Sequence, residues 1–259
     1  MPRLHSSLVF SALAGTDANG KPRYVTVKFY PCEERGRPFA FVLPGGAYAY
    51  VEWGPEGKAV ADALNAMGYN VFVCGYRCGF SKQGFAALAA EDALIGLRFA
   101  LSEAGQLGCD TAAYSIVGFS AGAHIALQMA AKGFDGSPPP ALLMCAYPLV
   151  DCAHGGAVVK LCRLCAYGTE GYKTPDSPVQ NVLMPLTEDC PPLYIWQGAD
   201  DAMLPIEFNS IQLSRRAEEL DIKYFFKQYP HVKHGAGIGT GSDAEGWLAD
   251  ACAVWEALR

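Results

Sequence analysis

Short apolar segments alternate with longer stretches of helical periodicity along nearly the whole 259-residue chain. The apolar segments are rich in β-branched and aromatic residues and are bounded by Gly, Pro or Asp, as is typical of buried strands. The stretches between them repeat apolar residues at three- and four-residue spacing, which indicates amphipathic helices. Because a helix between two strands brings the chain back parallel, this alternation predicts an α/β architecture with a mostly parallel sheet covered on both faces.

The pattern predicts about eight strands and at least five helices. Strands are expected at residues 4–13, 24–30, 39–43, 70–75, 114–117, 141–147, 193–197 and 223–229. Helices are expected at residues 57–67, 85–104, 121–132, 207–220 and 244–258. Since little helical sequence separates the first two or three strands, we expect these to form an antiparallel edge. No internal repeat or dividing linker is present, so residues 1–259 are predicted to be a single domain.

Residues 151–191 interrupt the alternation with an insertion that holds a short helical patch at 158–167. Long connections in compact domains are usually functional, so we interpret this one as a lid or a pocket wall. Its Cys162 and Cys165 have the spacing of a zinc or redox pair, but no second pair matches them. We expect them to face the core from one side of a helix.

Composition excludes several classes of partner. The net charge is −6 and the 20 Lys and Arg residues form no basic cluster, which argues against nucleic acid and anionic membranes as partners. No apolar run reaches the ~18 residues that a membrane helix needs. Several of the ten cysteines lie in apolar runs, and residues 1–15 are a poor signal peptide, so we expect a soluble cytoplasmic protein. The sequence does not indicate an oligomeric state.

The candidate nucleophile is Ser120, in the segment Gly118-Phe119-Ser120-Ala121-Gly122. This segment follows an apolar strand and begins a helix, and its glycines allow strand and helix to approach closely. Such a turn holds a serine hydroxyl above the sheet edge, near the N-terminal amides of the helix. The alternative is an ordinary turn or N-cap serine.

A nucleophilic serine needs a base and an acid that orients it, in loops after later strands. The candidates in the expected chain order are Asp200 and Asp201 for the acid, and His231 and His234 for the base. Among the remaining histidines, His124 is expected to be a packing residue on a helix. His154 is expected in a solvated loop, where contact with substrate is the alternative.

An oxyanion intermediate also needs hydrogen-bond donors. The amide of Ala121 is one by position, and the loop Pro44-Gly45-Gly46-Ala47-Tyr48 is the candidate for the second. Adjacent glycines let the backbone turn its N–H groups inward. The alternative is an ordinary Pro-Gly turn.

Together these segments resemble the α/β-hydrolase superfamily, and more narrowly its acetyl-xylan-esterase-like and hormone-sensitive-lipase-like small esterases. The resemblance runs from about residue 39 to the end of the chain. It includes Glu56-Gly57, Tyr147-Pro148, an Asp four residues before Pro205 and a His before Gly235. It implies the α/β-hydrolase fold, Asp201 as the acid, His234 as the base, and no metal or organic cofactor.

The sequence departs from many relatives in the oxyanion loop, where Pro44 replaces a His and Ala47 replaces a third Gly. Alanine still offers an amide, so Gly46, Ala47 and Ala121 are the expected donors.

We therefore predict a Ser120–His234–Asp201 triad that cleaves short-chain, chiefly acetyl, esters through an acyl-enzyme, with carbohydrates among the alcohols considered. Tyr48, Tyr50 and Trp53 follow the oxyanion loop and are expected either as an aromatic substrate rim or as packing residues. An amidase, arylformamidase or small peptidase with the same triad is the alternative enzyme. A ligand-binding α/β-hydrolase without turnover is the non-enzymatic alternative.

Overall fold

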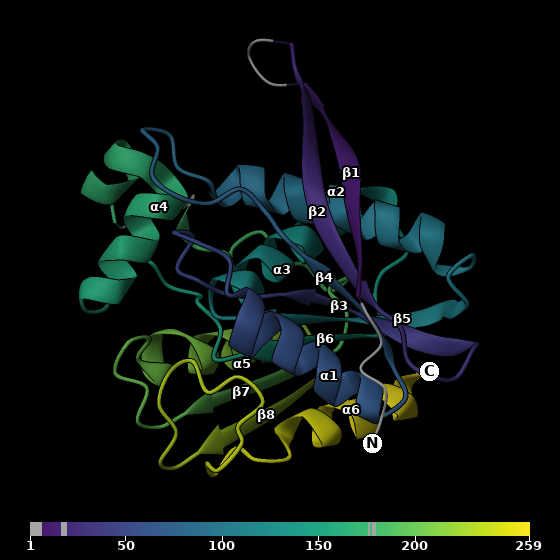
Figure 1. Cartoon of the computed structure of the whole chain (residues 1–259). Helices are drawn as coiled ribbons and strands as arrows, with labels where there is room; N and C mark the ends of the chain where they lie inside the picture. Colours follow the sequence, from purple (N-terminus) through teal and green to yellow (C-terminus); the bar gives the residue numbers. More distant parts are fainter. Residues whose placement is uncertain (1–6, 17–19, 176, 178–179) are drawn as a thin grey trace.

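The computed structural model describes residues 7–16, 20–175, 177 and 180–259. One eight-stranded sheet runs through the molecule in the order β1-β2-β4-β3-β5-β6-β7-β8 (Figure 1). The strands are β1 (Leu8–Thr16), β2 (Pro22–Tyr30), β3 (Arg37–Leu43), β4 (Asn70–Cys74), β5 (Cys109–Phe119), β6 (Leu142–Ala146), β7 (Leu193–Gly198) and β8 (Tyr224–Tyr229). This is the predicted α/β-hydrolase fold, with a mostly parallel sheet.

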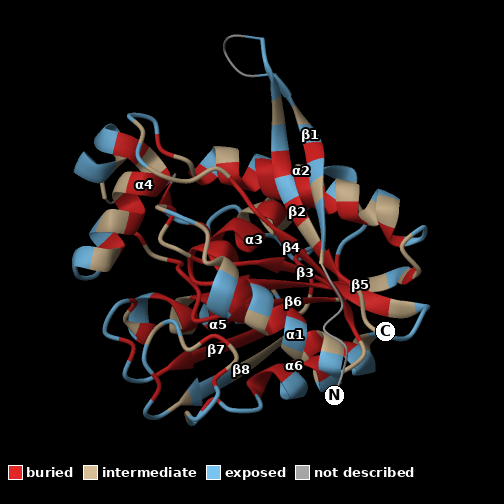
Figure 2. Cartoon of the chain, in the orientation of Figure 1, coloured by how far each residue is buried: buried red, intermediate tan, exposed pale blue. Residues whose placement is uncertain are grey.

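Helices cover both faces of the sheet. They are α1 (Ala59–Ala66), α2 (Ala86–Ala104), α3 (Ala121–Ala131), α4 (Ala157–Lys173), α5 (Ser210–Glu219) and α6 (Trp247–Leu258). One buried apolar cluster joins the sheet to α2, α3 and α5, and a second joins it to α1 and α6. Figure 2 shows the central strands buried between these two layers.

The sequence predicts an antiparallel edge of two or three strands, and in the structure only the first two strands along the chain form it. β2 pairs antiparallel with β1 and with β4, but β3 lies between β4 and β5 and is parallel to both. The reason is α1, which connects β3 to β4 and returns the chain in the same direction. The first strand begins at Leu8, while the expected residues 4–6 lie outside the described part of the chain.

Several helices begin later than the sequence predicts. A π-helical turn, η1 (Trp53–Lys58), precedes α1, and a 3₁₀ turn, η4 (Ile206–Phe208), precedes α5. A further 3₁₀ turn, η2 (Gly133–Gly136), follows α3. The expected patch at 158–167 is the longer α4, which kinks at Gly168 with φ 69°.

Within the described residues, no helix combines the length and the apolar character needed to cross a bilayer. The cytoplasmic location and the single-domain assignment stay predictions.

Helix α2 lies unusually close to the sheet at Gly96. A Cβ atom there would lie 2.4 Å from Sγ of Cys74 on β4 and 3.4 Å from the ring of Phe41 on β3. Cys74 is buried and its thiol bonds to the carbonyl of Gly75, so its sulfur has little room to move. Only a residue without a side chain fits between this helix and the sheet.

We expect Gly96→Ala to lower the free energy of unfolding by about 1–2 kcal/mol in urea titrations. The strain of overpacking should exceed the ~1 kcal/mol that alanine gains in helix propensity. The matched control is Gly105→Ala at the end of the same helix, where φ is −62° and a Cβ would meet nothing within 4 Å. That control should be neutral or slightly stabilising. Equal stability of the two variants would contradict this account of the packing.

Candidate active site

Ser120 occupies the sharp turn between β5 and α3. Its backbone has φ 50° and ψ −117°, a strained conformation for a residue with a side chain. A Cβ at Gly118 would lie 2.6 Å from Cα of Ala123, and one at Gly122 would lie 2.0 Å from the carbonyl oxygen of Leu43. The two glycines are therefore required by close contacts of the turn with α3 and with the end of β3.

Neighbouring strands hold the turn in place. The amide of Ser120 donates to the carbonyl of Ala146 at the end of β6, at 3.0 Å. The carbonyl of Ser120 accepts the amide of Leu149, just beyond β6, at 3.1 Å. Hydrogen bonds at both its amide and its carbonyl therefore hold this strained residue in place.

The structure brings Ser120, His234 and Asp201 together in one line of hydrogen bonds. Nε2 of His234 lies 2.9 Å from Oγ of Ser120, and Nδ1 lies 2.8 Å from Oδ2 of Asp201. Asp201 is buried after β7, and its other oxygen accepts the amides of Met203 and Leu204 at 3.1 and 2.9 Å. Because Nδ1 faces a carboxylate, it carries the ring proton and leaves Nε2 to accept the serine hydroxyl.

The other two acid and base candidates lie elsewhere. Asp200 is exposed, although it is the immediate neighbour of Asp201. The side chain of His231 is 81% exposed and pairs with Asp243, with Nδ1 3.0 Å from Oδ2. Of the four candidates that spacing left open, Asp201 and His234 are the two that lie in line with Ser120.

The candidate oxyanion loop has three consecutive residues with positive φ: Gly46 at 126°, Ala47 at 57° and Tyr48 at 60°. The amide of Gly45 donates to Oε2 of Glu56 at 2.7 Å. Among the described residues, the amides of Gly46 and Ala47 have no acceptor. A Cβ at Gly45 would lie 2.9 Å from Cβ of Ser120, so this loop is in contact with the candidate nucleophile.

Tyr48 is not part of an exposed aromatic rim. Its side chain is fully buried, and its hydroxyl lies 2.6 Å from Nδ1 of His124. Gln128 donates to the same hydroxyl, and the hydroxyl of Tyr167 on α4 lies 3.2 Å from Nε2 of His124. Burial lowers the pKa of His124 to about 4, so this ring is neutral at pH 7 and links α3, α4 and the oxyanion loop.

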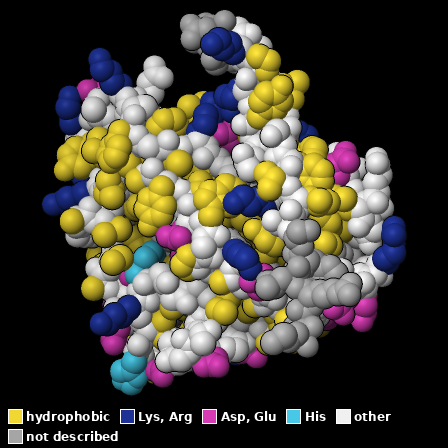
Figure 3. All heavy atoms as spheres, viewed as in Figure 1, with side chains coloured by type: hydrophobic (Ala, Val, Ile, Leu, Met, Phe, Trp, Pro, Cys, Tyr) yellow, Lys and Arg dark blue, Asp and Glu magenta, His cyan; other side chains and the backbone are white. Residues whose placement is uncertain are grey.

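Tyr50 and Trp53 both lie nearer the surface than Tyr48, and the Tyr50 ring would lie 3.3 Å from a Cβ atom at Gly46. Tyr50 is 55% exposed, and Nζ of Lys28 lies 4.0 Å from the centre of the half-buried Trp53 ring. Both line a cavity of about 520 Å³ whose other walls come from β2 and the loop after β4. Figure 3 shows hydrophobic side chains gathered around α4 and across the adjoining centre of this face.

A second buried carboxylate, Glu56 of η1, lies next to the candidate oxyanion loop and is not among the predicted site residues. Its Oε2 binds the Gly45 amide, and its Oε1 accepts the hydroxyl of Tyr147 at 2.7 Å. That hydroxyl in turn accepts the amide of Gly237 at 3.0 Å. Burial raises the pKa of Glu56, while its bonds to Tyr147 and Gly45 lower it. The sequence signal is the Glu56-Gly57 pair, which belongs to the family resemblance but indicates no role for the carboxylate.

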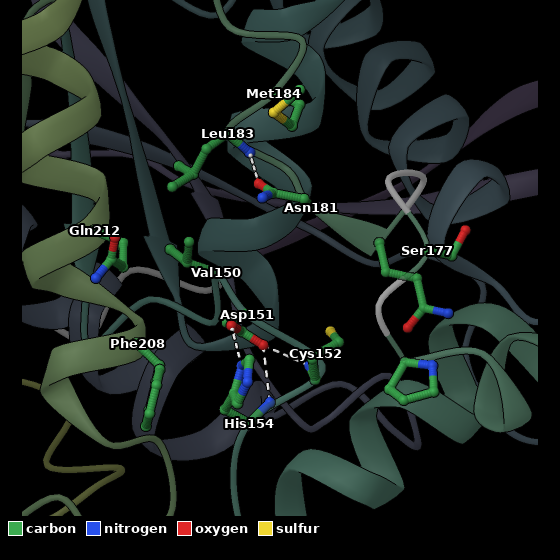
Figure 4. Close-up of a pocket in the computed structure, with 13 residues that line it drawn as sticks. Val150, Asp151, Cys152, His154, Ser177, Asn181, Leu183, Met184, Phe208 and Gln212 are labelled. Carbon is green, nitrogen blue, oxygen red and sulfur yellow. Dashed lines mark hydrogen bonds and ion pairs between the residues drawn. The ribbon is translucent and has the colours of Figure 1, made fainter.

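The insertion at 151–191 forms the wall of a cavity of about 500 Å³ (Figure 4). Its lining comes from residues 150–154 after β6, from Phe208 and Gln212, and from the segment after α4, which contributes Pro175, Ser177, Gln180, Asn181, Leu183 and Met184. The His154 ring stacks on Phe208 with centroids 4.7 Å apart, and its Nδ1 lies 2.9 Å from Oδ2 of Asp151. The lining begins at Val150, one residue after Leu149, whose amide is bonded to the Ser120 carbonyl, but it includes none of Ser120, His234 and Asp201.

Cys162 and Cys165 are buried on α4, as expected of core-facing residues. Burial raises the pKa of the Cys162 thiol to about 12. Within the described residues, no three His, Cys, Asp or Glu side chains converge as metal ligands.

Comparison with known sequences identifies related proteins. The family model described as BD-FAE matches residues 29–137. The acetylxylan esterase of Xylanibacter ruminicola is 28% identical over 231 residues, which cover 86% of this chain and 45% of that protein. Endo-1,4-β-xylanase B of Butyrivibrio fibrisolvens is 26% identical over 239 residues, covering 86% of this chain and 36% of that protein. The chain therefore spans less than half the length of these relatives.

Solved structures show the same fold over nearly the whole chain. An acetyl ester-xyloside bifunctional hydrolase from Caldicellulosiruptor lactoaceticus superposes with a TM-score of 0.80 at 21% identity, covering 96% of each chain. Carboxyl esterase 2 from Tuber melanosporum superposes with a TM-score of 0.81 at 17% identity, covering 100% of this chain and 90% of that one. These superpositions show that the chain has the α/β-hydrolase fold, and the two related sequences are similar to it over most of its length.

Proposed function

We propose that this protein is a serine esterase that hydrolyses short acyl esters, chiefly acetyl esters, through an acyl-enzyme. The observation that carries the proposal is the unbroken hydrogen-bond line from Asp201 through His234 to Ser120. A serine hydroxyl needs such a base to become a nucleophile at neutral pH, and the base needs a carboxylate to fix its tautomer.

In the proposed reaction, Oγ of Ser120 forms a bond to the ester carbonyl carbon while Nε2 of His234 takes the hydroxyl proton. The tetrahedral intermediate then breaks its bond to the alcohol oxygen, and His234 protonates that oxygen as the alcohol leaves. His234 next removes a proton from water, which attacks the acyl-enzyme. The carboxylic acid departs and Ser120 regains its proton.

The negative oxygen of each intermediate needs donors, and the amides of Gly46, Ala47 and Ala121 are the proposed ones. The positive φ angles of Gly46 and Ala47 support this role, as does the absence of other acceptors for these two amides in the described residues. Ala121 contributes the first amide of α3, at the positive end of the helix dipole. Loss of one such donor typically costs about 3 kcal/mol of transition-state stabilisation.

We further propose that the alcohol part of the ester is a carbohydrate and that it extends into the cavity walled by the insertion, whose lining begins two residues after Pro148 and one after Leu149, the residue bonded to the Ser120 carbonyl. Similarity to acetylxylan esterase supports this substrate class. The cavity wall combines the stacked pair His154 and Phe208 with the polar side chains of Asn181 and Gln212 (Figure 4). Aromatic faces and amides are the groups that bind the apolar face and the hydroxyls of a sugar ring.

The first functional prediction concerns Ser120→Ala, assayed on p-nitrophenyl acetate, butyrate and octanoate. Wild-type kcat/KM should fall steeply with acyl length, and the variant should lose about 1000-fold or more on acetate, because the nucleophile is absent. A parallel panel of amides and formamides separates an esterase from an amidase. Equal rates for wild type and Ser120→Ala would contradict the proposal.

The second prediction uses the adjacent aspartates as a matched pair. Asp201→Asn should lower kcat by about 10³- to 10⁴-fold, because the amide no longer holds His234 in the required tautomer. Asp200→Asn makes the same chemical change on an exposed neighbour and should retain wild-type kcat, as should His231→Ala. Similar losses in Asp200→Asn and Asp201→Asn would show that the acid is wrongly assigned.

The third prediction tests the carbohydrate cavity. Phe208→Ala should raise KM for an acetylated xylo-oligosaccharide several-fold, since the ring that stacks with His154 is removed, and should leave KM for p-nitrophenyl acetate nearly unchanged. Phe80→Ala, at an exposed phenylalanine outside the cavity lining, is the control. If KM for both substrates stays at the wild-type value in Phe208→Ala, the alcohol does not bind there.

A further inference from the structure

We propose that Glu56 is a positioning residue for the proposed acyl transfer. Its carboxylate joins the oxyanion loop to the histidine loop, which is the segment after β8 that carries His234. Its charge stabilises the imidazolium formed on His234. The inference rests on the proposed function, in which His234 becomes positively charged during each step. Glu56 belongs to η1, between these two loops, and is not a member of the Ser120–His234–Asp201 line.

The two oxygens of Glu56 serve different loops. Oε2 accepts the amide of Gly45 at 2.7 Å, and Gly45 immediately precedes the candidate oxyanion donors. Oε1 accepts the Tyr147 hydroxyl, which accepts the amide of Gly237, three residues after His234. The Tyr147 ring also packs edge-on against the His234 ring, with centroids 4.9 Å apart. One buried side chain therefore connects both halves of the proposed catalytic apparatus.

The hydrogen-bond pattern is that of an ionised carboxylate. The Gly45 amide is a donor by nature, and the Tyr147 hydroxyl directs its proton to Glu56 because its oxygen already accepts Gly237. A proton on either oxygen of Glu56 would weaken the bond to that oxygen's donor, because a carboxyl O–H oxygen is a poorer acceptor than a carboxylate oxygen. The bonds partly offset the rise in the Glu56 pKa that burial causes.

Among the groups that interact with Glu56, His234 is the one that becomes positively charged in the proposed reaction. The titratable groups that interact with it are Tyr147, Tyr76, Tyr50, Glu52 and His234. The tyrosines are neutral at pH 7 and Glu52 is negative. A proton transferred from Ser120 to His234 is thus attracted by two carboxylates, Asp201 in contact and Glu56 behind Tyr147.

Removal of this charge should shift the pH dependence of the reaction in a predictable direction. Without the Glu56 carboxylate the imidazolium is less stable, so His234 should lose its proton at a lower pH. The acid limb of kcat/KM should move to lower pH, and kcat should fall because the transition state carries the same imidazolium. If Glu56 had only a packing role, its loss would lower activity by displacing the catalytic groups, and the acid limb of the pH profile would stay in place.

The fourth prediction compares Glu56→Gln with Glu52→Gln, which removes the same charge four residues away. In Glu56→Gln, kcat should fall about 10-fold or more. The midpoint of the NMR titration of the His234 ring should fall by about half a pH unit or more. The His234 signals are assigned by their loss in His234→Ala. Glu52→Gln should shift neither quantity comparably, and thermal unfolding checks that each variant is folded.

A folded Glu56→Gln with the midpoint of wild type overturns the proposal, whether or not kcat falls. The titration needs no substrate, so a wild type that hydrolyses no ester would refute the proposed function while Glu56 is still tested. If Glu56→Gln does not fold, Tyr147→Phe carries the test, since it cuts the link to Gly237 and keeps the carboxylate. Its kcat should fall about 10-fold or more, and an unchanged kcat overturns the proposal.

Discussion

The close contact between the end of β3 and the Ser120 turn is the constraint on which the site depends. Gly122 leaves no room for a side chain against the Leu43 carbonyl, and Gly45 leaves none against Cβ of Ser120. These contacts bring the candidate oxyanion loop within reach of the serine hydroxyl. They also hold Ser120 in a backbone conformation that an isolated turn would not keep. The architecture of the site is therefore fixed by backbone packing before any polar side chain contributes.

Two buried polar networks hold the candidate oxyanion loop. In the first, the His124 ring is hydrogen-bonded to the hydroxyls of Tyr48 and of Tyr167 on α4. In the second, Glu56 accepts the amide of Gly45 and is linked through Tyr147 to the loop that follows His234. Unsatisfied polar groups would be costly in such buried surroundings, so each network also specifies one loop conformation. Helix α4 of the insertion and the loop that carries His234 are both connected in this way to the candidate oxyanion loop.

Local patterns predicted much of this arrangement. The periodicities of the strands and helices predict the sheet, and the Gly118–Gly122 turn predicts Ser120 as the nucleophile. Both signals arise within a few neighbouring residues. Chain order brought Asp201 and His234 into consideration, but only the structure separates them from Asp200 and His231. The missed features are long-range: Tyr48 meets His124 across 76 residues, and Glu56 meets Tyr147 across 91. Nothing near either residue in the sequence reveals such a partner.

The central claim is that Ser120 carries the acyl group during turnover. The most direct measurement is mass spectrometry of peptides from wild-type protein quenched in acid during hydrolysis of p-nitrophenyl acetate. The account predicts one acetyl group on the peptide that contains Ser120, and none on that peptide in His234→Ala quenched at the same time. Rapid turnover with acetyl on another residue, or with Ser120 unmodified while a burst of p-nitrophenol is observed, would contradict it.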